Sequence, residues 1–264
     1  MTYNLEQWRF KKNSFDDIMQ VIGAVKPDII CCQETLFPSQ QAKQIMNFFT
    51  DAGYVYGGYS DAYIETANSF GNVIFSKYPL KNIVTKLYDT QAPEEDRGYV
   101  GATIMFDNVP IRIYCTHLDV FDDTEQARLA EMKELFASIE KNDQKIDNVM
   151  ILGDFNAVRK QDYQYTVNGK KVWDLVIADD KARKVTTPTL LDDYLLTQPY
   201  VDSYALTKKK PPFTVWSGKI VDFIYCKPTM TLKCDDCSVY FASASDHLPV
   251  IADFSLPPQR KKSI

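Results

Sequence analysis

Hydrophobic residues fall along this chain in short runs that are bounded by glycine, proline, asparagine or aspartate. The runs are rich in Ile, Val, Tyr and Phe, and runs of this length and composition are typical of β-strands. Two of them are separated by Asp107 and Asn108, which favour the tight turn of a hairpin. We therefore predict strands over residues 1–5, 28–33, 55–59, 72–76, 100–106, 111–116, 149–152, 214–216, 220–226 and 248–254.

Three segments instead carry apolar residues at helical spacing, and we predict helices over residues 14–25, 39–49 and 124–139. Pro27 follows the first helix, a serine after a proline can cap the second, and the third has an apolar face opposite Glu and Lys. Residues 158–197 have the least regular pattern, and this segment is long enough to hold a substrate loop or a small insertion.

Hairpin strands mixed with helical returns predict an α/β fold in which two packed mixed sheets carry helices outside. The 264 residues contain no repeat and no Gly/Ser linker, so we expect a single domain over residues 1–264. The chain is 45% hydrophobic and 25% charged, which is typical of globular rather than disordered proteins. No apolar run approaches the roughly 18 residues that a transmembrane helix needs.

The formal net charge of −5 argues weakly against broad nonspecific binding to nucleic acid, although a local basic patch is compatible with it. The two basic clusters, residues 208–210 and 260–262, are more typical of a solvated loop and tail than of a ligand-binding patch.

The six cysteines bear on structure and compartment. Four lie in apolar runs and are expected to be small buried side chains: Cys31, Cys32, Cys115 and Cys226. Cys234 and Cys237 form a C-x-x-C with no second pair nearby, so ordinary strand cysteines are favoured over a zinc or redox site. Free cysteines and the absence of a signal peptide favour an intracellular location, an expectation that fails if the N-terminus has been trimmed.

Five polar clusters fall at or just beyond the ends of apolar runs, and both histidines of the chain lie in them. The clusters are Thr2-Tyr3-Asn4, Gln33-Glu34-Thr35, Thr116-His117-Leu118-Asp119, Gly153-Asp154-Phe155-Asn156 and Ser245-Asp246-His247. A further acid, Asp222, lies inside an apolar run, where a carboxylate is costly unless it is paired or bound to a cation. Histidine titrates near neutral pH, so it suits proton transfer and phosphate binding.

Taken singly, each of these polar residues has an ordinary structural explanation as a loop cap, a turn residue or an ion-pair partner. Taken together, they suit a hard divalent cation such as Mg²⁺, which needs only a few oxygen ligands from the protein. Asn4, Glu34 and Asp246 could supply those ligands. The cation would neutralise charge that grows on phosphate oxygens, while Asp154 or the metal prepares a water and Asn156 orients it.

Eight stretches extend this pattern over nearly the whole chain: Thr-Tyr-Asn at 2–4, Lys-Pro-Asp-Ile-Ile-Cys-Cys-Gln-Glu-Thr at 26–35, Phe-Gly-Asn-Val-Ile-Phe-Ser-Lys-Tyr-Pro-Leu at 70–80, Glu-Asp-Arg-Gly at 95–98, Cys-Thr-His-Leu-Asp at 115–119, Ile-Leu-Gly-Asp-Phe-Asn at 151–156, Val-Asp-Phe-Ile-Tyr at 221–225 and Ser-Asp-His-Leu-Pro-Val at 245–250. In this order they resemble the endonuclease/exonuclease/phosphatase superfamily, which includes pancreatic-type deoxyribonuclease and sphingomyelinases. The resemblance implies a four-layer α/β sandwich and Mg²⁺-dependent hydrolysis of a phosphate ester, with Mn²⁺ as a possible substitute.

The resemblance also implies roles by position. Glu34 would be the principal metal ligand, with Asn4 and Asp246 contributing. Asp154 and Asn156 would handle the nucleophilic water and a phosphate oxygen.

The remaining roles leave alternatives open. His247, oriented by Asp222, would serve as a base or a phosphate binder, and His117 would stabilise the transition state or help the leaving group. Arg97 would bind a phosphate oxygen, or form a surface ion pair with a neighbouring acid. Asn72 would face the substrate or simply pack beside a turn.

The substrate is less well defined than the reaction. His117 argues against the abasic-site endonucleases, which the chain resembles around residues 33–35 but which typically lack this histidine. We predict a monomeric, nuclease-like phosphodiesterase, with nucleic acid slightly favoured over phospholipid or inositol phosphate. A catalytically silent binding module is the alternative, disfavoured because no motif residue is lost. Four aromatic residues could stack on a base or press on lipid, although core or loop packing is favoured for each: Trp8, Tyr163, Trp173 and Trp216.

Overall fold

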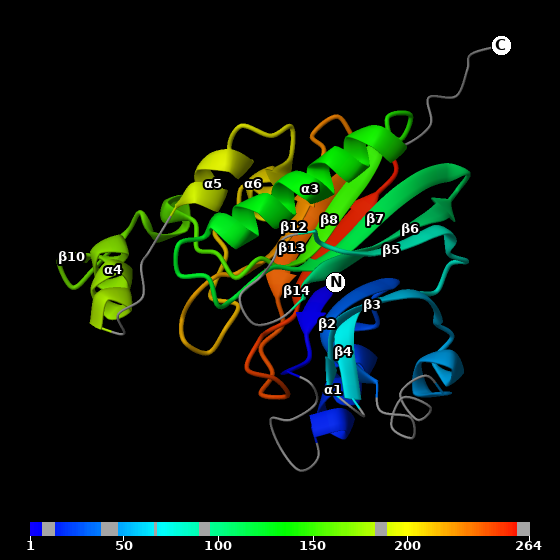
Figure 1. Ribbon diagram of the computed structural model, residues 1–264, viewed down its shortest axis with the longest axis horizontal. Helices are drawn as coiled ribbons and strands as arrows, with labels where there is room; N and C mark the ends of the chain where they lie inside the picture. The colour runs from blue at the N-terminus through cyan, green and yellow to red at the C-terminus, as the bar shows by residue number, and fades with distance from the viewer. Residues whose placement is uncertain (7–13, 38–46, 66–67, 90–95, 183–188, 258–264) are drawn as a thin grey trace.

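The computed structural model describes residues 1–6, 14–37, 47–65, 68–89, 96–182 and 189–257. In this part of the chain two six-stranded sheets face one another (Figure 1). The first sheet has the strand order β13-β14-β1-β2-β4-β3, and the second has the order β11-β12-β8-β7-β6-β5. Both sheets are mixed, because β1 and β2 pair in parallel in the first sheet, as β7 and β8 do in the second, while the other neighbours are antiparallel.

The elements have the following bounds. The first sheet contains β1 (Thr2–Asn4), β2 (Ile29–Phe37), β3 (Val55–Glu65), β4 (Asn68–Ser76), β13 (Lys233–Val239) and β14 (Val250–Ser255). The second contains β5 (Lys81–Leu87), β6 (Gly98–Phe106), β7 (Val109–His117), β8 (Asn148–Asp154), β11 (Val201–Asp202) and β12 (Asp222–Cys226). The helices are α1 (Ser14–Val25), α3 (Gln126–Asn142), α4 (Val172–Ala182), α5 (Leu190–Leu195) and α6 (Ser203–Thr207), with a 3₁₀ turn η2 (Lys160–Tyr163) and a small hairpin of β9 (Thr166–Val167) and β10 (Lys170–Lys171).

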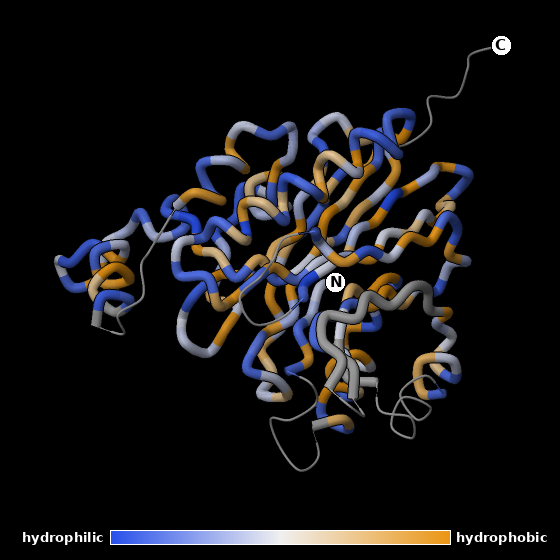
Figure 2. The backbone as a smooth tube through the Cα atoms, viewed as in Figure 1, coloured by the Kyte–Doolittle hydropathy of each residue, from blue (hydrophilic) through white to orange (hydrophobic). Residues whose placement is uncertain are grey.

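Three apolar clusters hold the layers together. Between the sheets, Ile74 of β4 belongs to one cluster with Ile113 of β7. On the outer face of the first sheet, Ile18 of α1 packs in a second cluster, and on the outer face of the second sheet Leu135 of α3 and Leu191 of α5 pack in a third. Figure 2 shows hydrophobic residues concentrated along the strands where these layers meet. The order helix, sheet, sheet, helix confirms the four-layer α/β sandwich with helices outside.

The strongly patterned elements match their predictions. Helix α1 has the predicted bounds, and α3 is displaced by two to three residues from the predicted range 124–139. The predicted turn joins β6 to β7, because Asp107 and Asn108 both have positive φ, at 47° and 64°. Of the predicted helix 39–49, residues 39–46 lie outside the described residues, and residues 47–49 are helical.

Other predictions were wrong. Residues 214–216 form no strand, because Val215 makes only an isolated bridge to His247. Strands β5 and β13 were missed, since both are edge strands whose charged residues interrupt the apolar pattern.

The irregular segment 158–197 contains η2, the β9–β10 hairpin, α4 and α5. Figure 1 shows α4 and β10 lying away from the sheets.

The cysteines and helices settle two smaller points. All six cysteines are free, and Cys234 and Cys237 are residues of β13, as ordinary strand cysteines would be. No helix in the described residues is long and apolar enough to cross a membrane.

Candidate active site

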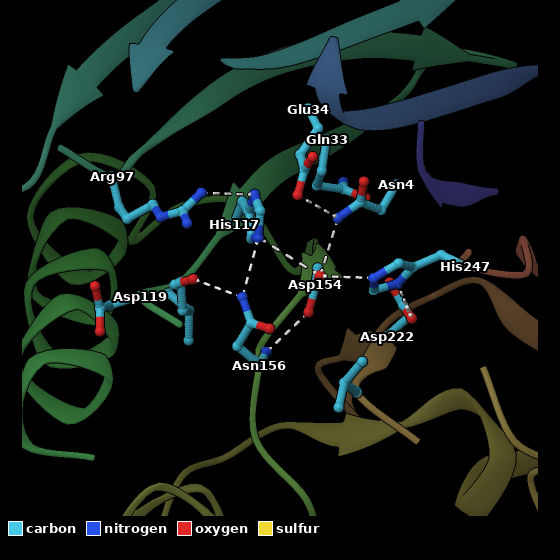
Figure 3. Close-up of polar contacts among 12 residues, drawn as sticks. Asn4, Gln33, Glu34, Arg97, His117, Asp119, Asp154, Asn156, Asp222 and His247 are labelled. Carbon is cyan, nitrogen blue, oxygen red and sulfur yellow. Dashed lines mark hydrogen bonds and ion pairs between the residues drawn. The ribbon is translucent and has the colours of Figure 1, made fainter. Parts of the chain in front are cut away.

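The strand register brings several of the predicted site residues together at one end of three neighbouring strands in the second sheet. His117 of β7 lies opposite Asp154 of β8, and Asp154 lies opposite Asp222 of β12. Neighbouring strands are about 4.8 Å apart, so a row across three strands brings these side chains within reach of one another. The first sheet contributes Asn4, whose Nδ2 donates to Asp154 Oδ2 at 3.1 Å (Figure 3).

Asp154 lies at the centre of the site. Its Oδ2 also lies 3.5 Å from Nε2 of His117 and 3.5 Å from Nε2 of His247, while its Oδ1 accepts the backbone N–H of Asn156 at 2.8 Å. Burial, reinforced by the nearby Asp222, raises the pKa of Asp154 to about 7, although His247 opposes this rise. The carboxyl therefore titrates close to neutral pH.

His247 is held as an imidazolium. Its Nδ1 lies 2.9 Å from Asp222 Oδ2, and its backbone N–H donates to Ser245 Oγ at 3.1 Å. Burial lowers the pKa of His247, but the carboxylates of Asp222 and Asp154 outweigh burial and raise it to about 10. At neutral pH this ring is a donor of charge-assisted hydrogen bonds and not a proton acceptor.

His117 has the opposite character. Burial and the positive charges of Arg97 and His247 hold the pKa of His117 well below its usual range. Arg97 Nη1 lies 3.1 Å from Nδ1 of this ring, and Asn156 Nδ2 lies 3.0 Å from its Nε2. Both groups can only donate, whereas a neutral imidazole accepts at one nitrogen, so the two contacts compete for that nitrogen. Asn156 Nδ2 also donates to the carbonyl of Leu118 at 2.9 Å.

Glu34 reaches the site from an irregular position in β2. The register of β2 against β4 shifts between Cys32 and Thr35, and Glu34 has a φ of 50° within this shift. Bulges of this kind redirect a side chain out of the regular alternation. Glu34 Oε1 accepts a second hydrogen bond from Asn4 Nδ2, at 3.2 Å. Burial raises the pKa of Glu34.

Glu6 also belongs to the site, and the sequence patterns missed it because no motif surrounds it. Its backbone N–H donates to Asn4 Oδ1 at 2.9 Å, and its Oε2 accepts the backbone N–H of Asp246 at 3.3 Å. Burial raises the pKa of both Glu6 and Glu34, and the negative charge of Asp246 adds to the rise. These three carboxylates therefore repel one another, and a divalent cation would relieve that repulsion.

The donor set on this side of the site fits a hard cation. Carboxylates and one amide are the oxygen donors that Mg²⁺ and Mn²⁺ prefer. A second group, Asp154, Asp222 and His247, has ligand atoms within 4.8 Å of one another. Because the pKa of His247 is raised to about 10, this second group is better described as an imidazolium between two carboxylates. A cation held by Glu34 and Asp246 stays a prediction.

The two predicted substrate-binding residues are placed differently. Arg97 is buried against His117 and not at the surface, so a surface ion pair does not describe it. Asn72 donates from Nδ2 to the carbonyl of Gly98 at 2.8 Å, a contact that ties β4 to β6. A contact between either residue and substrate stays a prediction.

Helix α3 supports the segment that carries His117. Glu131 is fully buried, and its Oε2 accepts the backbone N–H of Asp119 at 2.8 Å. Arg128 donates from Nη1 to the carbonyl of the same residue at 2.9 Å. Burial raises the pKa of Glu131 to about 8, with the nearby Asp119 adding to the rise.

The four aromatic residues considered for stacking have different environments. Tyr163 and Trp173 are buried in the cluster beneath α3, as core packing predicts, and Trp8 lies outside the described residues. Trp216 is 48% exposed and lines a cleft of about 520 Å³ beside His247.

Comparison with known proteins supports the same fold and chemistry. Residues 1–247 match the sequence model of the Endonuclease/Exonuclease/phosphatase family. No curated protein matched the chain.

Solved structures extend this likeness. An endonuclease/exonuclease/phosphatase family protein from Leptotrichia buccalis is 17% identical with a TM-score of 0.70, over 97% of this chain and 98% of that one. An AP endonuclease from Archaeoglobus fulgidus is 19% identical with a TM-score of 0.68, over 97% and 98% of the two chains. The human Nocturnin catalytic domain is 19% identical with a TM-score of 0.67, over 92% and 86%. At these identities the structures establish a shared fold.

Proposed function

Since this chain belongs to the endonuclease/exonuclease/phosphatase family of metal-dependent phosphoester hydrolases, we propose that it is a Mg²⁺-dependent phosphodiesterase with nuclease-like chemistry. The observation that carries the proposal is the convergence of His117 and His247 on Oδ2 of Asp154. Two imidazoles that converge beside a carboxyl whose pKa is near neutral suit a phosphate next to its attacking water.

Each polar group can be given a task. Asp154, with a pKa of about 7, accepts the proton of the attacking water at neutral pH. The imidazolium of His247, oriented by Asp222, donates to a phosphate oxygen and stabilises the charge that develops there. Neutral His117, in the tautomer protonated at Nε2, presents that proton to the phosphate or to the leaving oxygen.

The metal site follows from the acidic side of the cleft. Glu34 and Asp246, with the amide of Asn4 and with Glu6 beside them, would hold the cation. A bound Mg²⁺ would supply charge neutralisation at the phosphate and at the leaving oxygen. Mn²⁺ takes similar oxygen ligands and is expected to substitute.

Hydrolysis across a substrate panel tests the proposal. Single- and double-stranded DNA, RNA, 5′-tyrosyl DNA, sphingomyelin vesicles and inositol phosphates are incubated with and without Mg²⁺, with His247→Ala as the blank. We expect Mg²⁺-dependent turnover of nucleic acid that is lost in the variant. Full turnover in EDTA, or an undiminished rate in folded His247→Ala, would contradict the proposed mechanism.

A lipid headgroup is the second candidate, and one observation favours it. Phe241 is 57% exposed and packs edge-on against Phe213, which lies beside Trp216, so an aromatic group borders the cleft. Aromatic side chains at a rim can insert into a membrane interface. Mg²⁺-dependent turnover confined to sphingomyelin vesicles would select this candidate.

A further inference from the structure

The cleft beside the active site is shaped to hold a group attached to the bound phosphate. Its volume of about 520 Å³ falls within the range of roughly 300–1,000 Å³ that is usual for small-molecule sites. Asn156, Asp246 and His247 are among its lining residues, so any occupant would adjoin a phosphate bound at these residues. Trp216 and Arg128 also line the cleft.

Trp216 presents an aromatic surface whose polar edge is already satisfied. Its Nε1 donates to the carbonyl of Ser245 at 3.2 Å, and its backbone N–H donates to the carbonyl of Asp246 at 3.1 Å. The ring centroids of Phe213 and Trp216 are 5.7 Å apart, yet Trp216 stays 48% exposed. A half-exposed indole that is fixed by such contacts offers a flat apolar face for stacking.

The loop that carries Trp216 is fixed before any ligand binds. Thr214 Oγ1 accepts the backbone N–H groups of Val221 and Asp222 at 3.0 and 3.2 Å. The carbonyl of Thr214 accepts the backbone N–H of Leu248 at 2.7 Å. The loop is thus tied to the start of β12, which carries Asp222, and to the segment that carries His247. Little conformational entropy is therefore lost when a ring stacks on the indole.

Arg128 supplies a polar contact within the same cleft. It is only 6% exposed, and its Nε has no hydrogen-bond partner among the described residues. The nearest carboxylate oxygen, Glu125 Oε1, lies 3.8 Å away, beyond hydrogen-bond distance. Nε itself is enclosed by the protein, so an acceptor atom of a ligand in the cleft would meet the terminal N–H groups of the guanidinium instead.

The charges in the cleft oppose a second phosphate. Arg128 lies beside Glu125, and Lys219 Nζ is paired with Asp180 at 2.5 Å. With the imidazolium of His247 the lining has three cations, and four carboxylates outnumber them: Asp123, Glu125, Asp180 and Asp246. A neutral group therefore fits the cleft better than a further length of polyanion, which needs unpaired cations along its path.

We propose that this cleft binds one unpaired nucleoside that is attached to the scissile phosphate, with its base stacked on Trp216 and an acceptor atom bonded to Arg128. The inference rests on the proposed function and narrows its substrate to nucleotide esters and unpaired strand ends. A base within a duplex is already stacked and paired, so its face and edge are unavailable to these two residues.

Paired diesters that differ only in a base provide the kinetic test. A dinucleotide and its analogue with a tetrahydrofuran residue in place of one nucleoside are hydrolysed with Mg²⁺ by wild type, Trp216→Ala and Trp216→Phe. Base stacking on an aromatic residue is worth a factor of roughly 5 to 150. We expect Trp216→Ala to lose a factor of this size in kcat/KM on the dinucleotide alone, and Trp216→Phe to retain most of it.

Tyr165→Ala is the matched control, because Tyr165 is 46% exposed but does not line this cleft. It should leave both rates unchanged. Equal wild-type rates on the two diesters, or an equal loss on both in Trp216→Ala, would overturn the nucleoside site. Absence of Mg²⁺-dependent turnover on either diester would instead count against the proposed function.

A binding assay without turnover distinguishes failure of the nucleoside site from failure of the proposed hydrolytic function. Adenosine 5′-monophosphate and ribose 5-phosphate are titrated against the metal-free protein while tryptophan fluorescence is recorded, with Trp216→Phe as the blank. We expect the nucleotide to quench the emission of Trp216 and to bind at least about fivefold more tightly than ribose 5-phosphate. Equal affinity for the two ligands, or quenching that persists in Trp216→Phe, would overturn the proposal whatever the hydrolysis assay gives.

Discussion

Two buried charged clusters of this protein differ in how completely their polar atoms are paired. In the Arg159 cluster, Asp162 accepts from Arg159 at 2.7 and 2.9 Å, Asp202 accepts at 3.1 Å and the Tyr225 hydroxyl accepts at 3.1 Å. The guanidinium also lies 4.2 Å from the centroid of the Phe223 ring.

The Asp154 cluster, formed by Asp154, Asp222, His117 and His247, is paired less completely. Two imidazoles share Oδ2 of Asp154 at distances of 3.5 Å, and Asp222 Oδ1 is buried with no hydrogen-bond partner among the described residues. The first cluster satisfies its charges internally, and the second keeps donors and acceptors ready for a ligand. The contrast indicates that the Arg159 cluster serves stability and the Asp154 cluster serves chemistry.

Asp154→Asn should separate chemistry from stability most strongly. Loss of the proton acceptor should lower kcat by roughly 10²–10⁴-fold. The melting temperature should stay unchanged or rise, because a buried carboxyl whose pKa is raised to about 7 is replaced by a neutral amide. Steady-state kinetics at saturating Mg²⁺ and calorimetry check both parts, and an unfolded variant would break the contrast.

Arg159→Met should have the opposite outcome. It leaves the carboxylates of Asp162 and Asp202 buried without their cation, which should cost roughly 3–5 kcal/mol in the free energy of unfolding. Urea denaturation measures this loss, and kcat per folded molecule should not change. The control is Lys233→Met, which removes an exposed pair with Asp235 and should leave the urea midpoint nearly unchanged.

Glu34→Gln extends the comparison to the metal side. Removal of a charged ligand should lower turnover by about a hundredfold or more and raise the Mg²⁺ concentration needed for half-maximal rate, with folding nearly intact. Glu134→Gln is the control, because Glu134 pairs with Lys86 on α3's outer side and should not affect the Mg²⁺ titration. Unchanged Mg²⁺-dependent activity in Glu34→Gln would refute the ligand assignment.

Glu131→Gln should have its effect in the pH dependence of stability. The folded-state pKa of about 8 lies above the ordinary value of 4.5, so the stability that this group contributes is complete below about pH 4.5 and is lost as pH rises through 8. Wild type should therefore lose stability relative to the variant, by at most about 1.4 kcal/mol per pH unit. Urea unfolding from pH 5 to 8 checks this, and parallel curves would contradict it.

The sequence predicted the elements whose pattern is local. Helix α1 and the β6–β7 hairpin carry their own periodicity, stop signals and turn residues, so their bounds could be read directly. Strands β5 and β13 lie at sheet edges, where one face meets water and charged residues interrupt the alternation. The short run 214–216 instead became the loop that carries Trp216, because hydrogen bonds of Thr214 to neighbouring segments fix its path.

The site was predictable where residues stand in motifs and unpredictable where only packing joins them. Asn4, Asp154 and Asp222 meet as their motifs imply, although their individual roles remain predictions. Glu6 and Glu131 carry no signal, since ordinary flanking residues surround each acid and only the folded chain brings them to the site.

The contacts of Asn4 have a consequence for biosynthesis. Asn4 donates to Asp154, which is 150 residues further along the chain, and its carbonyl accepts from Ser245 Oγ, 241 residues away. Strand β1 also pairs with β14. Strand β2 is available to β1 early in synthesis, but a ribosome must release nearly the whole polypeptide before the first strand has all of its partners. The nascent chain would carry no hydrolytic activity during translation, and recovery of activity in refolding would report the last long-range contacts to form.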